Sequence, residues 1–179
     1  MSPKNILITG MPGVGKTTLI RNLITRLEGY QLAGFFTQEI RDKGVRKGFE
    51  LVGLDGKRGL LSHVSFKSRF RVGKYGVDVA GFDKFLDTTV FLNPETDLIL
   101  IDEIGKMECF SKKFLSLVNG ILESEIPMMA TVSRKGEGFI SAVKARTDVV
   151  LMELTTEGRT LLLDEVLRQL RSILESSKT

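Results

Sequence analysis

The sequence predicts an α/β protein in which a mainly parallel sheet is flanked by helices on both sides. Short apolar stretches alternate with stretches whose apolar residues recur every three or four positions, as strands and amphipathic helices do. Residues 97–101 end in four consecutive apolar residues, which is typical of a strand buried on both faces. Between about residues 33 and 79, glycines and short strand-like segments interrupt the alternation. We expect an antiparallel hairpin insertion there.

The first part of the chain predicts a strand, a glycine-rich turn and a helix. Residues 5–9 are the strand, and one helical stripe follows over residues 16–27, made of Leu19, Ile20, Leu23, Ile24 and Leu27. Residues 33–41 and 47–54 have the composition of strands, and turn signals follow each of them. We therefore expect antiparallel hairpins that are inserted into the alternating chain or packed beside it.

The remaining chain returns to alternating helices and strands. Phe82, Phe85, Leu86 and Val90 have helical spacing, and the strand 97–101 comes next. The later elements are a helix around residues 114–122, a strand at 127–132, a helix at 138–146, a strand at 148–154 and a helix at 159–175. The chain has 179 residues, of which 42% are hydrophobic, so we expect one domain that spans residues 1–179.

Composition argues against several classes of protein. No stretch approaches the roughly 18 uncharged apolar residues of a membrane span, and residues 6–8 are too few for a signal-peptide core. We therefore expect a cytoplasmic protein with no membrane partner. Cys109 is the only cysteine and His63 the only histidine, so the sequence offers no internal disulfide and no zinc site of these residues. A net charge of +4 suits an anionic ligand but is weak for a nucleic-acid binder, and we expect a monomer.

One motif near the start of the chain carries specific chemistry. Gly10-Met11-Pro12-Gly13-Val14-Gly15-Lys16-Thr17 matches G-x-x-x-x-G-K-[ST] at every fixed position, between a strand and a helix. Its glycines allow backbone N–H groups to converge on phosphate oxygens, and the helix dipole adds positive charge. Lys16 would serve the β- and γ-phosphates, and the Thr17 hydroxyl can ligate Mg²⁺. We include Thr18 with residues 10–17 in the predicted nucleotide-binding segment.

A second motif places two acids at the end of a buried strand. Four apolar residues, 98–101, precede Asp102 and Glu103. Ligands of open α/β sheets bind at the carboxyl ends of the strands. Asp102 is therefore predicted to belong to the nucleotide site and the Mg²⁺ shell, and Glu103 to polarise the attacking water. Lys106 could reach the γ-phosphate or pair with a carboxylate, and Glu108 is the next acid that could replace Glu103.

The two motifs together resemble the thermophile-type nucleoside-triphosphatase family, which includes a human cancer-related nucleoside-triphosphatase. The resemblance rests on residues 10–18 and on Asp102-Glu103-Ile104-Gly105-Lys106-Met107-Glu108, and further landmarks extend it over the whole chain. It implies a RecA-like P-loop core and slow, Mg²⁺-dependent hydrolysis of ATP, GTP, CTP and UTP. One departure stands out: where the family often has Thr-x-x-Asn-Arg after the last strand, this chain has Gly158 before Arg159. Arg159 remains available to stack on a base or to pair with an acid.

Three other functions share parts of this pattern. A small nucleoside or nucleotide kinase has the same core, and Arg134-Lys135-Gly136 and Arg146 could form its arginine-rich lid. A switch GTPase requires an Asn-Lys-x-Asp motif, and the sequence contains none. An ATPase acting on RNA or DNA is disfavoured by the modest charge and by the lack of an aromatic stacking platform.

Overall fold

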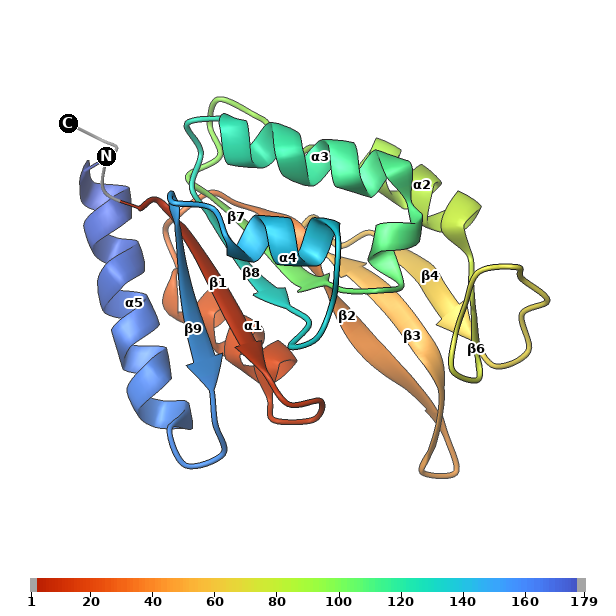
Figure 1. Cartoon of the computed structure of the whole chain (residues 1–179). Helices are drawn as coiled ribbons and strands as arrows, with labels where there is room; N and C mark the ends of the chain where they lie inside the picture. Colours follow the sequence, from red (N-terminus) through yellow and green to blue (C-terminus); the bar gives the residue numbers. More distant parts are fainter. Residues whose placement is uncertain (1–2, 177–179) are drawn as a thin grey trace.

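The computed structural model of the protein describes residues 3–176. In chain order its elements are β1 (Asn5–Gly10), α1 (Lys16–Arg26), β2 (Leu32–Asp42), β3 (Val45–Gly53), β4 (Arg58–His63), β5 (Arg71–Val72), β6 (Tyr75–Val77), α2 (Val79–Thr88), β7 (Leu98–Ile104), the short 3₁₀ helix η1 (Glu108–Phe110), α3 (Lys112–Glu123), β8 (Met128–Val132), α4 (Phe139–Lys144), β9 (Val149–Leu154) and α5 (Arg159–Ser176) (Figure 1). The predicted strands and helices are present in the predicted order.

All the strands belong to one sheet, in the order β5-β6-β4-β3-β2-β7-β8-β1-β9. The half that runs from β2 to β9 is parallel, and the half that runs from β2 to β5 is antiparallel. The sheet is therefore mixed, which corrects the expectation of a mainly parallel sheet. The change of direction occurs because β2 continues beyond its parallel pairing with β7 into a tight turn. Lys43 and Gly44 in that turn have φ of +47° and +80°, and such a turn returns the chain antiparallel.

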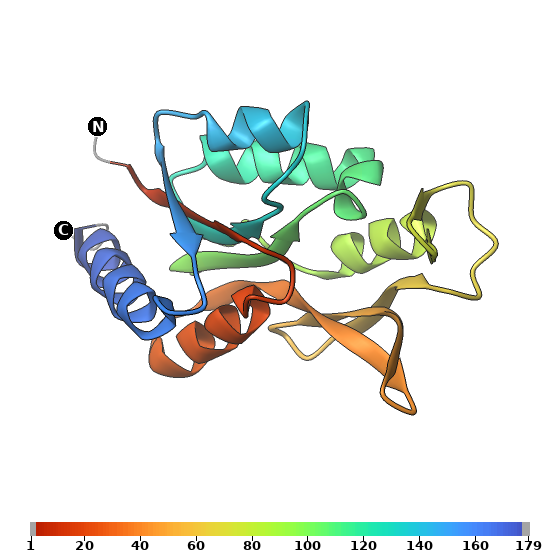
Figure 2. The same cartoon turned by 60° about the horizontal axis from the view of Figure 1, so that its bottom comes forward.

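Helices cover both faces of the sheet (Figure 2). Alternate residues of β1 enter different cores: Ile6 and Ile8 pack with α1 and α5, whereas Leu7 packs on the opposite side with α2, α3 and α4. This division follows from the two-residue period of a strand. Because both faces are buried, β1 is apolar along most of its length and its functional residues lie at its carboxyl end.

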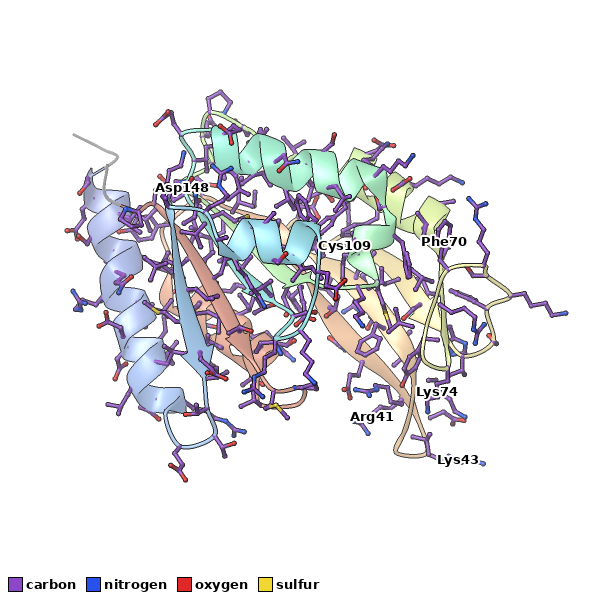
Figure 3. All side chains as sticks on the ribbon, in the orientation of Figure 1. Arg41, Lys43, Phe70, Lys74, Cys109 and Asp148 are labelled. Carbon is purple, nitrogen blue, oxygen red and sulfur yellow. The ribbon has the colours of Figure 1, made fainter. Side chains whose placement is uncertain are left out.

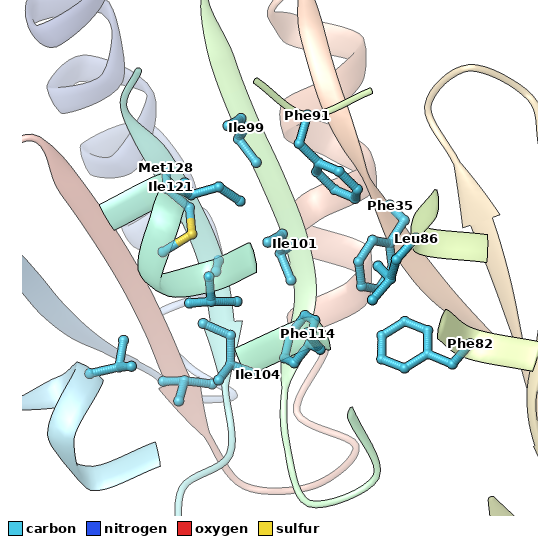
Figure 4. Packing of buried hydrophobic residues seen from close by; sticks show 14 of the residues in the cluster. Phe35, Phe82, Leu86, Phe91, Ile99, Ile101, Ile104, Phe114, Ile121 and Met128 are labelled. Carbon is cyan, nitrogen blue, oxygen red and sulfur yellow. The ribbon is translucent and has the colours of Figure 1, made fainter. Parts of the chain in front are cut away.

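The core on the α2–α3 side is built around aromatic residues (Figure 4). The ring of Phe35 meets that of Phe82 edge-on at a centroid distance of 5.8 Å, and Phe82 lies 5.5 Å from Phe114. Such pairs contribute about 0.5–1.5 kcal/mol beyond their buried area. They fix β2, α2 and α3 to one another, and so fix β2 beside the strand that carries Asp102.

Several boundaries differ from the sequence prediction by one to three residues, and those of α2 and β7 illustrate the reasons. Val90 is 65% exposed and lies outside α2, which ends at Thr88. The reason is local, because the hydroxyls of Thr88 and Thr89 both bond to the Phe85 carbonyl and compete with further helical turns. The strand β7 also continues to Ile104, past its predicted end at residue 101. Within residues 3–176, no helix is long and apolar enough to cross a membrane.

Candidate active site

The loop between β1 and α1 holds the predicted phosphate-binding motif, residues 10–17. Gly13 and Gly15 have left-handed backbone conformations, with φ of +78° and +107°, which glycine adopts without a steric penalty. Gly10 packs closely, since a Cβ there would lie 2.7 Å from the carbonyl oxygen of Leu154. The loop leads directly into α1, whose amino-terminal N–H groups and dipole favour an anion. Its conformation and position therefore suit a phosphate group.

Asp102 is the centre of a hydroxyl network beside this loop. Its Oδ2 accepts a hydrogen bond from Thr17 Oγ1 at 2.6 Å, and its Oδ1 accepts one from Thr131 Oγ1 at 2.5 Å. Thr37 donates its hydroxyl and its backbone N–H to Oδ2 at 3.3 and 3.4 Å. Only 2% of Asp102 is exposed, so these donors replace water and orient the carboxylate. Thr17 and Asp102 together offer oxygen ligands of the kind that Mg²⁺ prefers.

Glu103 contacts a different group of residues from its neighbour. Its Oε2 lies 3.5 Å from Lys16 Nζ, and its Oε1 accepts a hydrogen bond from Ser133 Oγ at 2.9 Å. Lys16 Nζ also donates to the Gly10 carbonyl at 3.3 Å. The Glu103 side chain is 29% exposed and that of Lys16 is 11% exposed, so both can be reached from solvent. The Lys16 amine and the Glu103 carboxylate therefore lie together near Gly10, at the start of the loop, and a small molecule can reach the carboxylate.

The backbone between Ile101 and Ile104 is irregular, and this region carries both acids. The register between β7 and β8 shifts between these two isoleucines. The peptide bond between Asp102 and Glu103 is cis. A regular strand would send neighbouring side chains to opposite faces. In this segment Asp102 contacts Thr17 and Glu103 contacts Lys16, so both acids lie against the same loop.

Glu108 is a second carboxyl group close to Glu103. A Cβ added to Gly105 would lie 2.9 Å from Glu103 Oε1 and 2.9 Å from Glu108 Oε2, so both side chains converge on this glycine. Glu108 is only 5% exposed. Burial raises the pKa of Glu108 well above its ordinary value, and the charge of Glu103 raises it further. Glu108 is therefore protonated far more readily than an exposed glutamate.

The arginines that the sequence singled out lie in three different places. Arg159, at the start of α5, lies against the loop, because a Cβ on Gly15 would be 3.6 Å from its Nε. Arg134 also reaches the loop: its Nη1 lies 2.7 Å from the Met11 sulfur. Arg146 pairs with Asp148 at 2.8 Å, at the amino-terminal end of β9 and away from the loop (Figure 3). The structure therefore brings Arg134 and Arg159 to the candidate site but not Arg146.

Three hydroxyl residues of the site were missed by the sequence analysis. Thr37, Thr131 and Ser133 have no motif of their own, and they come from β2 and from the end of β8. Thr131 did leave a signal, since it is a polar residue inside a strand that is buried throughout. A buried strand hydroxyl needs a hydrogen-bond partner, and a neighbouring strand that ends in an acid provides one. Lys106, for which two roles were open, is exposed.

The fold and the loop geometry define a class of protein. A glycine-rich loop between the first strand and the first helix, with an aspartate beside it on another parallel strand of the same sheet, is the arrangement of P-loop nucleotide-binding proteins. Comparison with known proteins narrows this class. A family model described as NTPase matches residues 5–167. Nucleoside-triphosphatase THEP1 of Thermotoga sp. (strain RQ2) is 43% identical over 167 residues, which cover 93% of this chain and 95% of that protein.

Solved structures agree with the sequence match. The crystal structure of THEP1 from the hyperthermophile Aquifex aeolicus aligns with a TM-score of 0.80 at 36% identity, over 93% of this chain and 98% of that one. The solution structure of a human cancer-related nucleoside triphosphatase aligns with a TM-score of 0.77 at 34% identity, over 94% of this chain and 98% of that one. The chain therefore belongs to the nucleoside-triphosphatase family of these proteins, and the resemblance inferred from the two motifs is confirmed.

Proposed function

We propose that this protein is a Mg²⁺-dependent nucleoside triphosphatase that transfers the γ-phosphoryl group to water and accepts several bases. The observation that carries the proposal is the separation of the two neighbouring acids. Asp102 is hydrogen-bonded to Thr17, whereas Glu103 faces Lys16. One acid is thereby committed to the position of a metal ion, and the other remains available to a water molecule. Family membership supports hydrolysis of nucleoside triphosphates.

The loop and its neighbours would hold the substrate by its phosphates. Residues 10–18 supply backbone N–H groups and the charge of Lys16, which neutralise phosphate oxygens. Thr17 and Asp102 are the residues that would hold Mg²⁺. When bound, the ion would offset the charge on the β- and γ-phosphates. Thr131 and Thr37 keep the Asp102 carboxylate in its orientation. Preorganised groups of this kind lower the barrier because they need no rearrangement during the reaction.

Glu103 would act on the attacking water. Its carboxylate orients the water and accepts one of its protons as the water oxygen bonds to the γ-phosphorus. The bond between the γ-phosphorus and the bridging oxygen breaks, and a nucleoside diphosphate and inorganic phosphate leave. Ser133 donates to Oε1 of Glu103 at 2.9 Å, and Oε2 lies 3.5 Å from Lys16 Nζ. With Lys16 bound to phosphate oxygens, Oε2 would be the oxygen available to the water.

Two finer assignments belong to the same proposal. We assign the parallel half of the sheet to a RecA-like core, and residues 33–79 to an antiparallel insertion within one domain. The antiparallel extension of the sheet through β3, β4, β6 and β5 supports the second assignment. Gly158, which has no side chain to read a base, supports broad tolerance of ATP, GTP, CTP and UTP. The kinase alternative loses one of its two lid candidates, because Arg146 pairs with Asp148 away from the loop.

Product analysis with Mg²⁺ and ATP tests the proposal. The protein is incubated with ATP alone and with candidate phosphate acceptors, and inorganic phosphate is expected in both cases with no phosphorylated acceptor. A chelator should abolish turnover and added Mg²⁺ should restore it. The variant Lys16→Ala should be inactive, because it removes charge that the transition state needs. Turnover in the chelator, or turnover of Lys16→Ala within about threefold of the wild type, equivalent to roughly 0.7 kcal/mol, would refute the assigned site.

A further inference from the structure

Arg134 is a cation beside the loop that the proposed mechanism does not use. Its Nη1 lies 2.7 Å from the sulfur of Met11, the second residue of the phosphate-binding motif. Its Nε lies 3.4 Å from Glu153 Oε1, and both of these side chains are about half exposed. An exposed ion pair of this length contributes little to stability. Arg134 is therefore held near the loop loosely enough to exchange Glu153 for another anion.

The position of Arg134 along the loop indicates which phosphate it would meet. Ser133, its neighbour in the chain, donates to Glu103, and Glu103 faces Lys16 Nζ. The contact with Met11 places Arg134 at the amino-terminal end of the loop. The amine of Lys16 reaches the same end, because it donates to the Gly10 carbonyl at 3.3 Å, and there Lys16 and Glu103 would serve the reacting phosphate. Arg159 lies at the other end, against Gly15 and the start of α1. The two arginines therefore contact different residues of the loop, and Arg134 is the one that directly follows Ser133, the hydrogen-bond donor to Glu103.

The segment that carries Arg134 is fastened at its base. Lys144 on α4 donates its amine to the carbonyl oxygens of Ser133 and Arg134, at 2.5 and 2.9 Å. The Ser133 N–H also donates to the Ile104 carbonyl at 3.1 Å, which ties the segment to β7. In Figure 1 this segment, between β8 and α4, descends toward the loop that follows β1. These hydrogen bonds fix the backbone of Arg134, while its side chain remains exposed.

We propose that Arg134 contacts the γ-phosphate of the bound nucleoside triphosphate and supplies, from within the same chain, the arginine charge that stabilises phosphoryl transfer. A guanidinium presents planar, paired donors that match phosphate oxygens. An arginine that acts on the transferring group in this way is worth about 10³–10⁵-fold in turnover in other phosphoryl-transfer enzymes. The inference rests on the proposed function, and it removes the need for a second protein or a second copy of the chain to provide the arginine.

Three variants test the role of Arg134. Arg134→Ala should lower kcat by about 10²-fold or more, and Arg134→Lys should recover only part of this loss, because an amine lacks the planar fork. Lys135→Ala is the matched control, since Lys135 is the exposed next residue, and it should retain wild-type turnover. ADP affinity should stay within about twofold in Arg134→Ala, whereas the affinity for a non-hydrolysable ATP analogue should fall, because only the analogue has a γ-phosphate. Thermal unfolding checks that each variant is folded.

A mixing experiment tests whether the arginine acts within the chain. Arg134→Ala and Lys16→Ala are mixed in equal amounts, and the rate is expected to be the sum of the two separate rates. Recovered activity in the mixture would mean that Arg134 acts on another molecule and would overturn the proposal. Turnover of Arg134→Ala within about threefold of wild type, with Lys16→Ala inactive, would overturn it while the proposed function stands. An active Lys16→Ala would instead refute the proposed function and this inference with it.

Discussion

Asp102 and Glu103 are adjacent in the chain, yet their surroundings differ. Asp102 is almost completely buried and accepts hydrogen bonds from Thr17, Thr131 and Thr37. Glu103 is partly open to solvent and has one hydroxyl donor, Ser133. Hydrogen bonds that orient a buried carboxylate prepare it to hold an ion in one position, whereas a carboxylate that solvent can reach is well placed to accept a proton from water. This difference predicts that substitution of Asp102 and substitution of Glu103 impair different properties of the protein.

Glu103→Gln should separate binding from chemistry. The amide keeps the size and polarity of the side chain but cannot accept a proton from water, so turnover should fall by about 10²-fold or more. Nucleotide affinity should remain within a few-fold, because the loop and Asp102 are unchanged. Both quantities are measured with ATP and Mg²⁺, by steady-state kinetics and by equilibrium binding. Glu137→Gln, at an exposed position between β8 and α4, serves as the control. Near-normal turnover in a folded Glu103→Gln would show that Glu103 is not the group that accepts the proton from water. Glu108 would then be the next carboxyl group to test.

Glu108 should make the stability of the protein depend on pH. Burial holds its pKa in the folded state well above the ordinary value of 4.5, and the charge of Glu103 adds to this effect. Below about pH 4.5 both states keep the proton. As the pH rises, the unfolded state releases it first, so the contribution of Glu108 is lost as the pH passes toward its folded pKa. Glu108→Gln, which can still accept hydrogen bonds, should become more stable relative to the wild type between pH 4.5 and 8.

Urea unfolding at several pH values measures this difference. The control is Glu28→Gln, at an exposed position between α1 and β2, whose stability relative to the wild type should change little with pH. If the difference between Glu108→Gln and the wild type is the same at pH 4.5 and pH 8, Glu108 does not keep its proton in the folded protein.

The residues that the sequence predicted are those whose spacing is itself the motif. Lys16 and Thr17 are positioned by one loop, and Asp102 and Glu103 by one strand end, so a single short segment determines each pair. Thr37 and Thr131 belong to other strands, and their contact with Asp102 depends on which strands are neighbours. Strand order is set by packing and by crossover connections, and spacing in the sequence does not encode it. The contacts of Thr37 and Thr131 with Asp102 can therefore be identified only from the three-dimensional structure.

At the scale of the elements, the approach of β2 to β7 depends on one glycine. Gly34 has a φ of +128°, and a Cβ there would lie 1.8 Å from the carbonyl oxygen of Leu100. No side chain fits in that space, so the parallel pairing that brings Thr37 to Asp102 requires glycine at this position. The sequence predicted strands at residues 33–41 and 97–101, but it did not predict that they pair.

Gly34→Ala should therefore be strongly destabilising, by about 3 kcal/mol or more, because the substitution combines backbone strain with a clash inside the sheet. Gly44→Ala is the matched control. Gly44 also has a positive φ, of +80°, but a Cβ there meets no atom of the described residues within 4 Å. It should cost only about 1–2 kcal/mol. The free energy of unfolding is measured for both in urea. If both variants lose the same free energy of unfolding, the close approach of β2 to β7 does not add to the cost of Gly34→Ala.

At the scale of the whole molecule, the sheet separates the two apolar cores from each other, and the candidate site lies at the carboxyl ends of its parallel strands. Apolar clusters fill both faces, and the functional side chains come from the loop after β1, from the carboxyl-terminal parts of β7 and β8, and from β2. The layered α/β architecture follows from the alternation of elements in the sequence. The change from parallel to antiparallel pairing does not, because it is made in one tight turn after β2. The contacts around the loop and Asp102 are thus defined, and for base recognition the chain offers Gly158 and Arg159 at the start of α5.

This arrangement predicts a protein that distinguishes bases weakly. Arg159 lies against Gly15, and we expect it to stack on the base of the bound nucleotide, whichever base that is, because every base offers a π face. Gly158 beside it has no side chain that could read a base edge. The values of kcat/KM for ATP, GTP, CTP and UTP should therefore lie within about two orders of magnitude, equivalent to ~3 kcal/mol, when measured at the same Mg²⁺ concentration.

Gly158→Asn adds the missing amide and provides the comparison. A Cβ at this position would lie 3.0 Å from Thr155 Oγ1, which is a side-chain atom, so the substitution requires only a small adjustment. The variant should change the ratios of kcat/KM among the four triphosphates, because a directed amide hydrogen-bonds to some base edges and not to others. It should leave phosphate binding intact, which ADP and inorganic triphosphate affinities would confirm. A wild-type preference of a thousandfold or more for one base would contradict the prediction, since it requires a base-reading group that neither Arg159 nor Gly158 provides.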